Sequence, residues 1–302
     1  MNRLLKFKFE RNFGIEYEFT NTSSSLTRMA DLVRSLVGDE CRVVSYEHTR
    51  NNYNYWVCKT DRSCGTELVS PILHGPAALK KATDILVALH DDDFRINNSC
   101  GQHVHIEIAD FTTEQVGILV AYWLKVERFI INGTPAHRRQ NSFCSPSTHH
   151  FTINPTYKYD PELILRSFSS GRRAINLGNW IASENRGTVE FRFGEMTFNP
   201  EIVKNRVRFL IWLVEMCRIL PMPNNLKWFS PKEALSMFGL WEDPSSIIKY
   251  QYSPAMQSMR KWLLKRLVQY APPVFEKDIV RCRKMLEELE GVETAQIAEQ
   301  EI

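Results

Sequence analysis

The stretch Gly187–Pro200, which reads GTVEFRFGEMTFNP, constrains most strongly what this chain can fold into. Its apolar residues alternate with Glu190 and Arg192, and this period of two predicts a strand with one apolar and one charged face. The two charged side chains then lie on the same face, about 7 Å apart at a rise of ~3.3 Å per residue. A solvated edge strand would show the same pattern, so the meaning of this face depends on the other strands.

Three further stretches are predicted as strands that carry ionisable side chains. They read FGIEYEF at 13–19, TELVSPI at 66–72 and NNSCGQHVHIEI at 97–108. In the first and third, the ionisable residues share one face and apolar residues occupy the other. With the loop before the second stretch, these strands contribute Glu16, Glu18, Asp61, Glu67, His103, His105 and Glu107. Each motif alone also fits a solvated face or a structural pair, but four such strands suit a sheet that surrounds one site.

The residue types on these faces favour a particular kind of site. Like charges such as Glu16 and Glu18 on one strand face repel each other unless a positive group lies between them, and a divalent cation is the simplest such group. Oxygen-rich ligand sets with few nitrogens favour magnesium or manganese over zinc. Carboxylates with arginine and histidine fit two or more metals that hold a polyphosphate. Neither GxxxxGK[ST] nor GxGxxG occurs, so neither a P-loop nor a Rossmann site is predicted.

Helical patterns dominate the rest of the chain. Helices are expected at 24–37, 75–90, 112–131, 161–167 and 200–220, and strands at 41–46, 53–58 and 174–180, the first two joined as a hairpin. After Pro221 only helical pattern is visible. The expected organisation is therefore an α+β domain over residues 1–220, followed by a helical extension over 221–302. We expect this extension to act as a cap or as a contact in a homo-oligomer.

Composition excludes some classes of protein. The chain has 302 residues, 43% hydrophobic and 24% charged, which is ordinary for a globular protein. Its net charge of +3 is too small to indicate nucleic acid as a partner. The longest apolar run, Gly117–Leu124, is far too short for a membrane span. The seven cysteines are scattered without a CxxC pair, which predicts reduced thiols in a cytoplasmic protein.

In order and spacing, the four motifs resemble those of amidoligases in the glutamine synthetase / glutamate–cysteine ligase superfamily. GIEYEF is similar to the first ExE strand of that family, and TELVSPI to its acidic second strand. NNSCGQHVHIEI resembles the strand with a glycine before HxH, and RGTVEFRFGEMTFNP the closing ExR strand with its Asn-Pro. The resemblance covers roughly residues 13–215.

The resemblance implies a fold and a reaction. The fold is a curved, mainly antiparallel sheet of the glutamine-synthetase catalytic type, flanked by helices, that holds ATP and two or three Mg²⁺ ions, with Mn²⁺ as an alternative. In the reaction, a carboxylate takes the γ-phosphoryl group of ATP, and an amine attacks the resulting acyl phosphate. The partners are a small-molecule or peptide carboxylate and an amine, whose identities the resemblance does not supply.

The resemblance also implies roles for individual residues. It places one metal on Glu16, His103 and Glu190. It places a second on Glu18, Glu67 and Asp61, although the short spacing from Asp61 to Glu67 departs from the family pattern. The residues expected at the phosphates are His105, Arg192, Arg173 and Arg186. Of these, His105 and Arg192, together with Glu190, form the expected catalytic set.

The general base is the least determined part of the prediction. An amine must be neutral to attack an acyl phosphate, so a carboxylate is expected near the amine. Glu184 and Glu195, which flank the closing strand, are the candidates.

Two other functions stay open at this point. A metal-dependent phosphohydrolase or nuclease would use the same carboxylates and HxH pair. A binding protein could keep the fold and lack catalysis. Loss of ATP that requires both an acid and an amine would distinguish a ligase from both.

Overall fold

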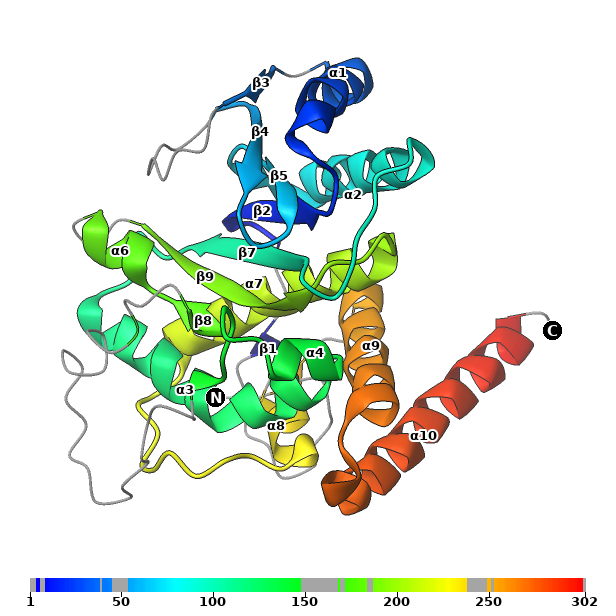
Figure 1. The fold of residues 1–302 in the computed structure, drawn as a ribbon. Helices are drawn as coiled ribbons and strands as arrows, with labels where there is room; N and C mark the ends of the chain where they lie inside the picture. Colours follow the sequence, from blue (N-terminus) through cyan, green and yellow to red (C-terminus); the bar gives the residue numbers. More distant parts are fainter. Residues whose placement is uncertain are drawn as a thin grey trace.

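An eight-stranded sheet forms the centre of the molecule (Figure 1). In this computed structural model, the described residues are 4–5, 9–38, 40–44, 54–147, 168, 172–183, 187–237, 249–250 and 253–300. The strand order is β3-β4-β5-β2-β7-β9-β8, and β6 pairs separately with β2. Most neighbouring strands of this sheet run antiparallel, which confirms the predicted α+β fold with a mainly antiparallel sheet.

The four central strands are those that the polar motifs predicted. They are β2 (Asn12–Phe19), β5 (Gly65–Val69), β7 (Gly101–Glu107) and β9 (Thr188–Glu195). They pair antiparallel in the order β5-β2-β7-β9, although they are far apart in sequence. All four polar motifs therefore lie side by side.

The edges of the sheet differ from the prediction. The remaining strands of the sheet are β3 (Cys41–Val43), β4 (Trp56–Asp61), β6 (Leu73–His74) and β8 (Ile175–Asn176). The predicted hairpin between 41–46 and 53–58 is wrong, because β3 and β4 run parallel. In the sequence, residues 44–55 separate β3 from β4, which is more than a tight hairpin turn uses. The predicted strand at 174–180 is extended only in β8, after which Gly178–Ala182 forms the short helix α6.

Four helices pack on the apolar face of the sheet (Figure 1). They are α1 (Leu26–Val37), α2 (Gly75–Asp91), α3 (Thr113–Asn132) and α7 (Pro200–Ile219). From α3, Trp123 contacts the rings of Phe191 and Phe193 at centroid distances of 5.3 and 5.7 Å. From β2, the Tyr17 hydroxyl donates a hydrogen bond to the Ala82 carbonyl oxygen of α2. The apolar residues of the predicted alternation thus form the core.

Local signals fix the ends of these helices. Thr112 and Gln115 form the capping box at the start of α3, with both reciprocal hydrogen bonds present. The Asn199 side chain accepts hydrogen bonds at the start of α7. Gly38 ends α1 at a φ of 64°, which a residue with a Cβ adopts only with strain.

The C-terminal part is mainly helical and packs on the core. Its helices are α8 (Pro231–Met237), α9 (Pro254–Tyr270) and α10 (Glu276–Gln300). Two short strands, β1 (Leu4–Leu5) and β10 (Lys249–Tyr250), pair parallel and link this part to the N-terminus. α9 packs against α7 and α3, whereas α10 packs mainly on α9 and projects outward (Figure 1). None of the helices that the structure describes is both long and apolar enough to cross a membrane.

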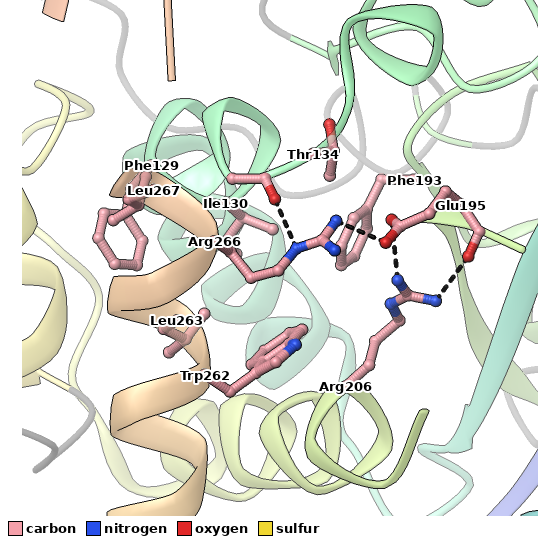
Figure 2. A pocket seen from close by; sticks show the side chains of 11 residues that line it. Phe129, Ile130, Thr134, Phe193, Glu195, Arg206, Trp262, Leu263, Arg266 and Leu267 are labelled. Atoms are coloured by element: carbon pink, nitrogen blue, oxygen red, sulfur yellow. Dashed lines mark hydrogen bonds and ion pairs between the residues drawn. The ribbon is translucent and has the colours of Figure 1, made fainter. Parts of the chain in front are cut away.

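A buried ion network joins α9 to the end of β9 (Figure 2). The Glu195 carboxylate contacts Arg206 of α7 at 2.9 Å and Arg266 of α9 at 2.6 Å. The Arg266 Nε also donates a hydrogen bond to the Gly133 carbonyl oxygen. Burial lowers the pKa of Arg206 to about 10, against the opposing charge of Glu195. Removing one member would leave buried charges unpaired, so these residues hold β9 and α9 together.

We expect α9 to contribute to the stability of the whole chain. Leu264 in α9 is fully buried, so Leu264→Ala should lower the free energy of unfolding by about 2–5 kcal/mol. Leu36→Ala in α1 is the matched control, because 48% of that side chain is exposed and its change should stay within about 0.5 kcal/mol. Urea unfolding measures both. Equal effects in the two variants would show that α9 does not share the core.

Candidate functional site

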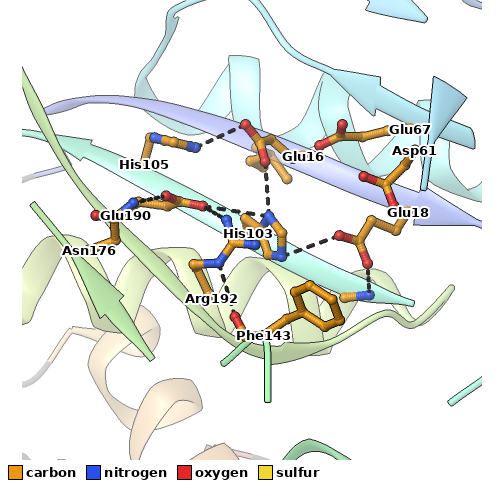
Figure 3. A network of polar contacts seen from close by, with 12 residues as sticks. Glu16, Glu18, Asp61, Glu67, His103, His105, Phe143, Asn176, Glu190 and Arg192 are labelled. Atoms are coloured by element: carbon orange, nitrogen blue, oxygen red, sulfur yellow. Dashed lines mark hydrogen bonds and ion pairs between the residues drawn. The ribbon is translucent and has the colours of Figure 1, made fainter. Parts of the chain in front are cut away.

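Strand register brings the predicted polar residues together on the face opposite the helices (Figure 3). Directly opposed pairs across neighbouring strands are Glu16 with His103, Glu18 with Glu67, and His105 with Glu190. Each pair joins residues from different motifs. The alternation that buries the apolar residues of β2, β7 and β9 therefore also builds this cluster.

His103 lies between three carboxylates. Its Nδ1 is 2.9 Å from Glu16 Oε2 and 3.6 Å from Glu190 Oε1, and its Nε2 is 3.4 Å from Glu18 Oε1 (Figure 3). The residue is only 5% exposed. Both ring nitrogens of this imidazole thus face carboxylate oxygens, and a ring nitrogen without a proton can donate its lone pair to a cation.

His105 makes the second contact with Glu16. Its Nε2 is 3.1 Å from Glu16 Oε1, and its Nδ1 is 3.3 Å from Thr188 Oγ1. Burial opposes the ionisation of both partners, but their mutual attraction outweighs it. The pKa of Glu16 is consequently well below its usual range, and the pKa of His105 is raised.

Glu190 and Arg192 lie on the same face of β9, as predicted, and they form an ion pair, which was not predicted from the sequence. Asn176 of β8 donates a hydrogen bond of 2.8 Å to the other Glu190 oxygen. Arg192 Nε donates to the Phe143 carbonyl oxygen at 3.3 Å. Burial disfavours both charges, but the pair holds the pKa of Glu190 below and that of Arg192 above its ordinary value. The arginine is thus held by two fixed partners.

Glu67 is a carboxylate crowded by others. It is only 4% exposed, and burial together with the charge of Glu16 raises its pKa well above the ordinary value. Lys59 Nζ, 3.0 Å away, offsets only part of this. Asp61 lies at the outer end of the same group, where hydrogen bonds from Ser63 and Cys64 outweigh burial and lower its pKa. Glu67 is therefore the carboxylate of this group that the neighbouring negative charges disfavour most.

Three sets of donor atoms in this cluster could each hold a metal ion. Within each set, all ligand atoms lie within 4.8 Å of one another. The sets are Glu16, His105 and Glu190; Glu16, Glu67 and His103; and Glu18, Asp61 and Cys64. All six predicted metal ligands occur in these sets, but the sets also contain His105, which was expected at the phosphates, and Cys64, which was not predicted. The grouping differs too, since Glu67 falls with Glu16 and His103 rather than with Glu18 and Asp61. Glu16 is common to two sets and bridges them.

Some predicted residues do not join the cluster. Arg173 contacts the Phe168 ring at 5.4 Å and lies near the charge of Glu127, away from the carboxylates. Glu195 is wrong as a candidate base, because it is buried between two arginines on the apolar side of β9. Arg186 and Glu184 lie outside the residues that the structure describes, as does the helix predicted at 161–167.

The structure also adds residues that the motifs did not suggest. They are Lys59, Cys64, Asn176 and Thr188, which contact Glu67, Asp61, Glu190 and His105 respectively. Thr188 precedes Glu190 by two residues, so face alternation could have identified it. Asn176 required the register of β8 against β9, which no local pattern specifies.

The crowding of Glu67 gives a stability prediction. A carboxyl group whose pKa is raised on folding destabilises the protein as the pH rises above its unfolded value of about 4.3. In the presence of EDTA, Glu67→Gln should therefore unfold at higher urea concentration than the wild type at pH 8, with the difference vanishing towards pH 4. Glu114→Gln, at an exposed carboxylate in the first turn of α3, is the control and should show no such gain. A Glu67→Gln variant no more stable than the wild type at pH 8 would contradict the repulsion.

Comparisons with known proteins place this geometry in a family. The family model described as "Putative amidoligase enzyme" matches residues 9–214. No curated protein sequence matches the chain significantly. A chain from the crystal structure of the complex between the prokaryotic ubiquitin-like protein Pup and its ligase PafA is 12% identical, with a TM-score of 0.34. The match covers 96% of the present chain and 66% of that one. Because the family model spans most of the chain, including all four strands of the cluster, the protein belongs to the amidoligase family.

Proposed function

We propose that the protein is an ATP-dependent carboxylate–amine ligase that works through an acyl phosphate on a glutamine-synthetase-like sheet. The observation that carries the proposal is the set of register-opposed pairs on one sheet face: Glu16–His103, Glu18–Glu67 and His105–Glu190. Amidoligase family membership supplies the reaction class. ATP, the metal ions and the intermediate are parts of the proposal.

The proposed chemistry follows from the properties of a carboxylate. A carboxylate is a poor acyl donor, because displacement by an amine would have to expel oxide. Transfer of the γ-phosphoryl group of ATP to one carboxylate oxygen supplies phosphate as the leaving group. This transfer brings two anions together, so the site must offset negative charge.

The donor set fits divalent cations. The carboxylates outnumber the nearby cationic side chains, and the raised pKa of Glu67 shows repulsion that a cation would relieve. We assign Mg²⁺ or Mn²⁺ to Glu16, Glu18, Asp61, Glu67, His103 and Glu190. When bound there, the ions would neutralise phosphate oxygens.

Arg192 and His105 are proposed to contact the phosphoryl group directly. Arg192 shares its strand face with Glu190, so its remaining guanidinium donors can reach an oxygen of the transferring group. His105 has one nitrogen on Glu16 and the other near Thr188. Its raised pKa favours the charged form, which suits a contact with phosphate.

Isotope transfer tests the proposed function. The protein is first incubated with ATP, Mg²⁺ and pooled amino acids, peptides and polyamines, and products are sought whose mass equals acid plus amine minus water. The acid so identified is then labelled with heavy oxygen in its carboxylate. An acyl-phosphate route must deliver one labelled atom to each released phosphate. Label found in AMP would show adenylation instead, and ATP loss without an amide would show hydrolysis; either result would overturn the proposal.

The role of Arg192 gives a quantitative prediction. Arg192→Lys keeps the charge but loses the planar fork of donors that reaches Glu190 and the Phe143 carbonyl. We expect turnover to fall at least tenfold, or about 1.4 kcal/mol in barrier, with a smaller change in KM for ATP. Arg42→Lys, at an exposed arginine on β3, is the control. A fall confined to KM would place Arg192 in ground-state binding rather than in phosphoryl transfer.

A further inference from the structure

The polar face of the sheet continues beyond the cluster, towards the start of β2. Glu107 follows His105 by two residues on β7, and its neighbours Ile106 and Ile108 are fully buried on the other face. On β9, Thr188 lies directly opposite Glu107 in the strand register. Glu107 therefore extends the row of His103 and His105 on the same face, although it belongs to none of the three candidate metal sets.

Within the part of the chain that the structure describes, the Glu107 carboxylate is held in place by an amide rather than by a cation. Asn12 Nδ2 donates a hydrogen bond of 3.0 Å to Glu107 Oε2, and Asn12 Oδ1 lies 3.1 Å from His74 Nδ1. Arg11 donates a hydrogen bond to the backbone carbonyl oxygen of Glu107, but its guanidinium group forms ion pairs with Asp110 and Glu215 instead of with the Glu107 carboxylate. Among the residues that the structure describes, no cation pairs with the Glu107 carboxylate. One of its oxygens is thus available to a ligand.

A glycine leaves room between this carboxylate and the cluster. The residues of β2 on the polar face are Asn12, Gly14, Glu16 and Glu18, and Gly14 lies directly opposite His105. A Cβ at Gly14 would meet only His105 Cβ and Ser70 Oγ, both at 3.7 Å. The polar face of β2 consequently has no side chain at Gly14, and we call this bare stretch of backbone the floor. A ligand group resting there would have Glu107 on one side and the Glu16–His105 pair on the other.

From this arrangement we propose that Glu107 binds the ammonium group of the amine substrate in a subsite above Gly14 and accepts one of its protons, so that the neutral amine can attack the acyl phosphate. The inference rests on the proposed function. ATP and the acid are anions, so both belong at the metal-binding cluster, whereas the amine arrives as a cation. A lone carboxylate with one amide partner offers too few ligands for a metal ion but forms a strong charge-assisted hydrogen bond with an ammonium group. Glu107 thus determines specificity for an amine over an alcohol or water.

The test compares two nucleophiles in one reaction. Hydroxylamine is small and neutral near pH 7.5, and it intercepts acyl phosphates as hydroxamates without needing a carboxylate partner. With ATP, Mg²⁺, the pooled acids and an equal mixture of hydroxylamine and pooled primary amines, Glu107→Gln should lower the ratio of amide to hydroxamate at least tenfold. Glu114→Gln, an exposed carboxylate on α3, should leave the ratio unchanged. An unchanged ratio in Glu107→Gln would overturn the assignment of Glu107 even though the ligase reaction stands.

If the wild type forms no product, that result counts against the proposed function. A binding measurement then still tests the role of Glu107. In calorimetric titration, 1,5-diaminopentane should bind the wild type at least tenfold more tightly than Glu107→Gln, and 1,5-pentanediol should not distinguish them. Gly14→Val, which fills the floor without touching the carboxylate, should weaken diamine binding likewise. Equal diamine affinity in wild type and both variants would show that no ammonium subsite exists there.

Discussion

Repulsion among buried carboxylates on one sheet face is the constraint on which the rest of this structure depends. Glu16, Glu18, Glu67 and Glu190 all lie within one cluster. Within the part of the chain that the structure describes, the potential cations in contact with them are His103, His105, Arg192 and Lys59. If the strands could shift in register, the repulsion between these carboxylates would favour a pairing that moves them away from one another. The cluster stays assembled because the apolar side chains on the other face are buried. A register shift of one residue would place Glu16 in the core and expose Ile15. The apolar packing of β2, β7 and β9 therefore holds the charges together.

The same dependence explains why the C-terminal helices cannot be treated as an attachment to a finished domain. β9 carries Glu190 and Arg192 in its middle and Glu195 at its end, where Arg206 and Arg266 bind the carboxylate. Three elements from distant parts of the chain thus fix one strand. Because α9 supplies one of the two arginines, the position of β9 depends on a helix that lies outside the family match, which ends at residue 214.

How far the sequence predicts this molecule depends on the kind of information that each feature needs. Alternation within a strand identified the ionisable members of the cluster on β2, β7 and β9, because a period of two assigns each side chain to a face. Consistent use of the same rule would also have excluded Glu195 as a base, since it shares its face with Phe191 and Phe193. Partners across strands were not predictable in this way. The parallel pairing of β3 with β4, the contact of Asn176 with Glu190, and the joining of Cys64 to Asp61 all depend on a register or a turn that no local pattern specifies.

The arrangement of charge over the sheet gives a reason why a ligase would keep so costly a cluster. A reaction that joins an acid to an amine must gather two anions and one cation, and then separate phosphate from the product. One uniform charged pocket would bind either the anions or the cation well, but not both. Here the cationic groups and candidate metal ligands lie around Glu16, while Glu107 lies apart from them, beyond the floor at Gly14. Because a strand places successive same-face residues about 7 Å apart, two steps along β7 are enough to separate these electrostatic environments while keeping them within reach of one bond-forming reaction.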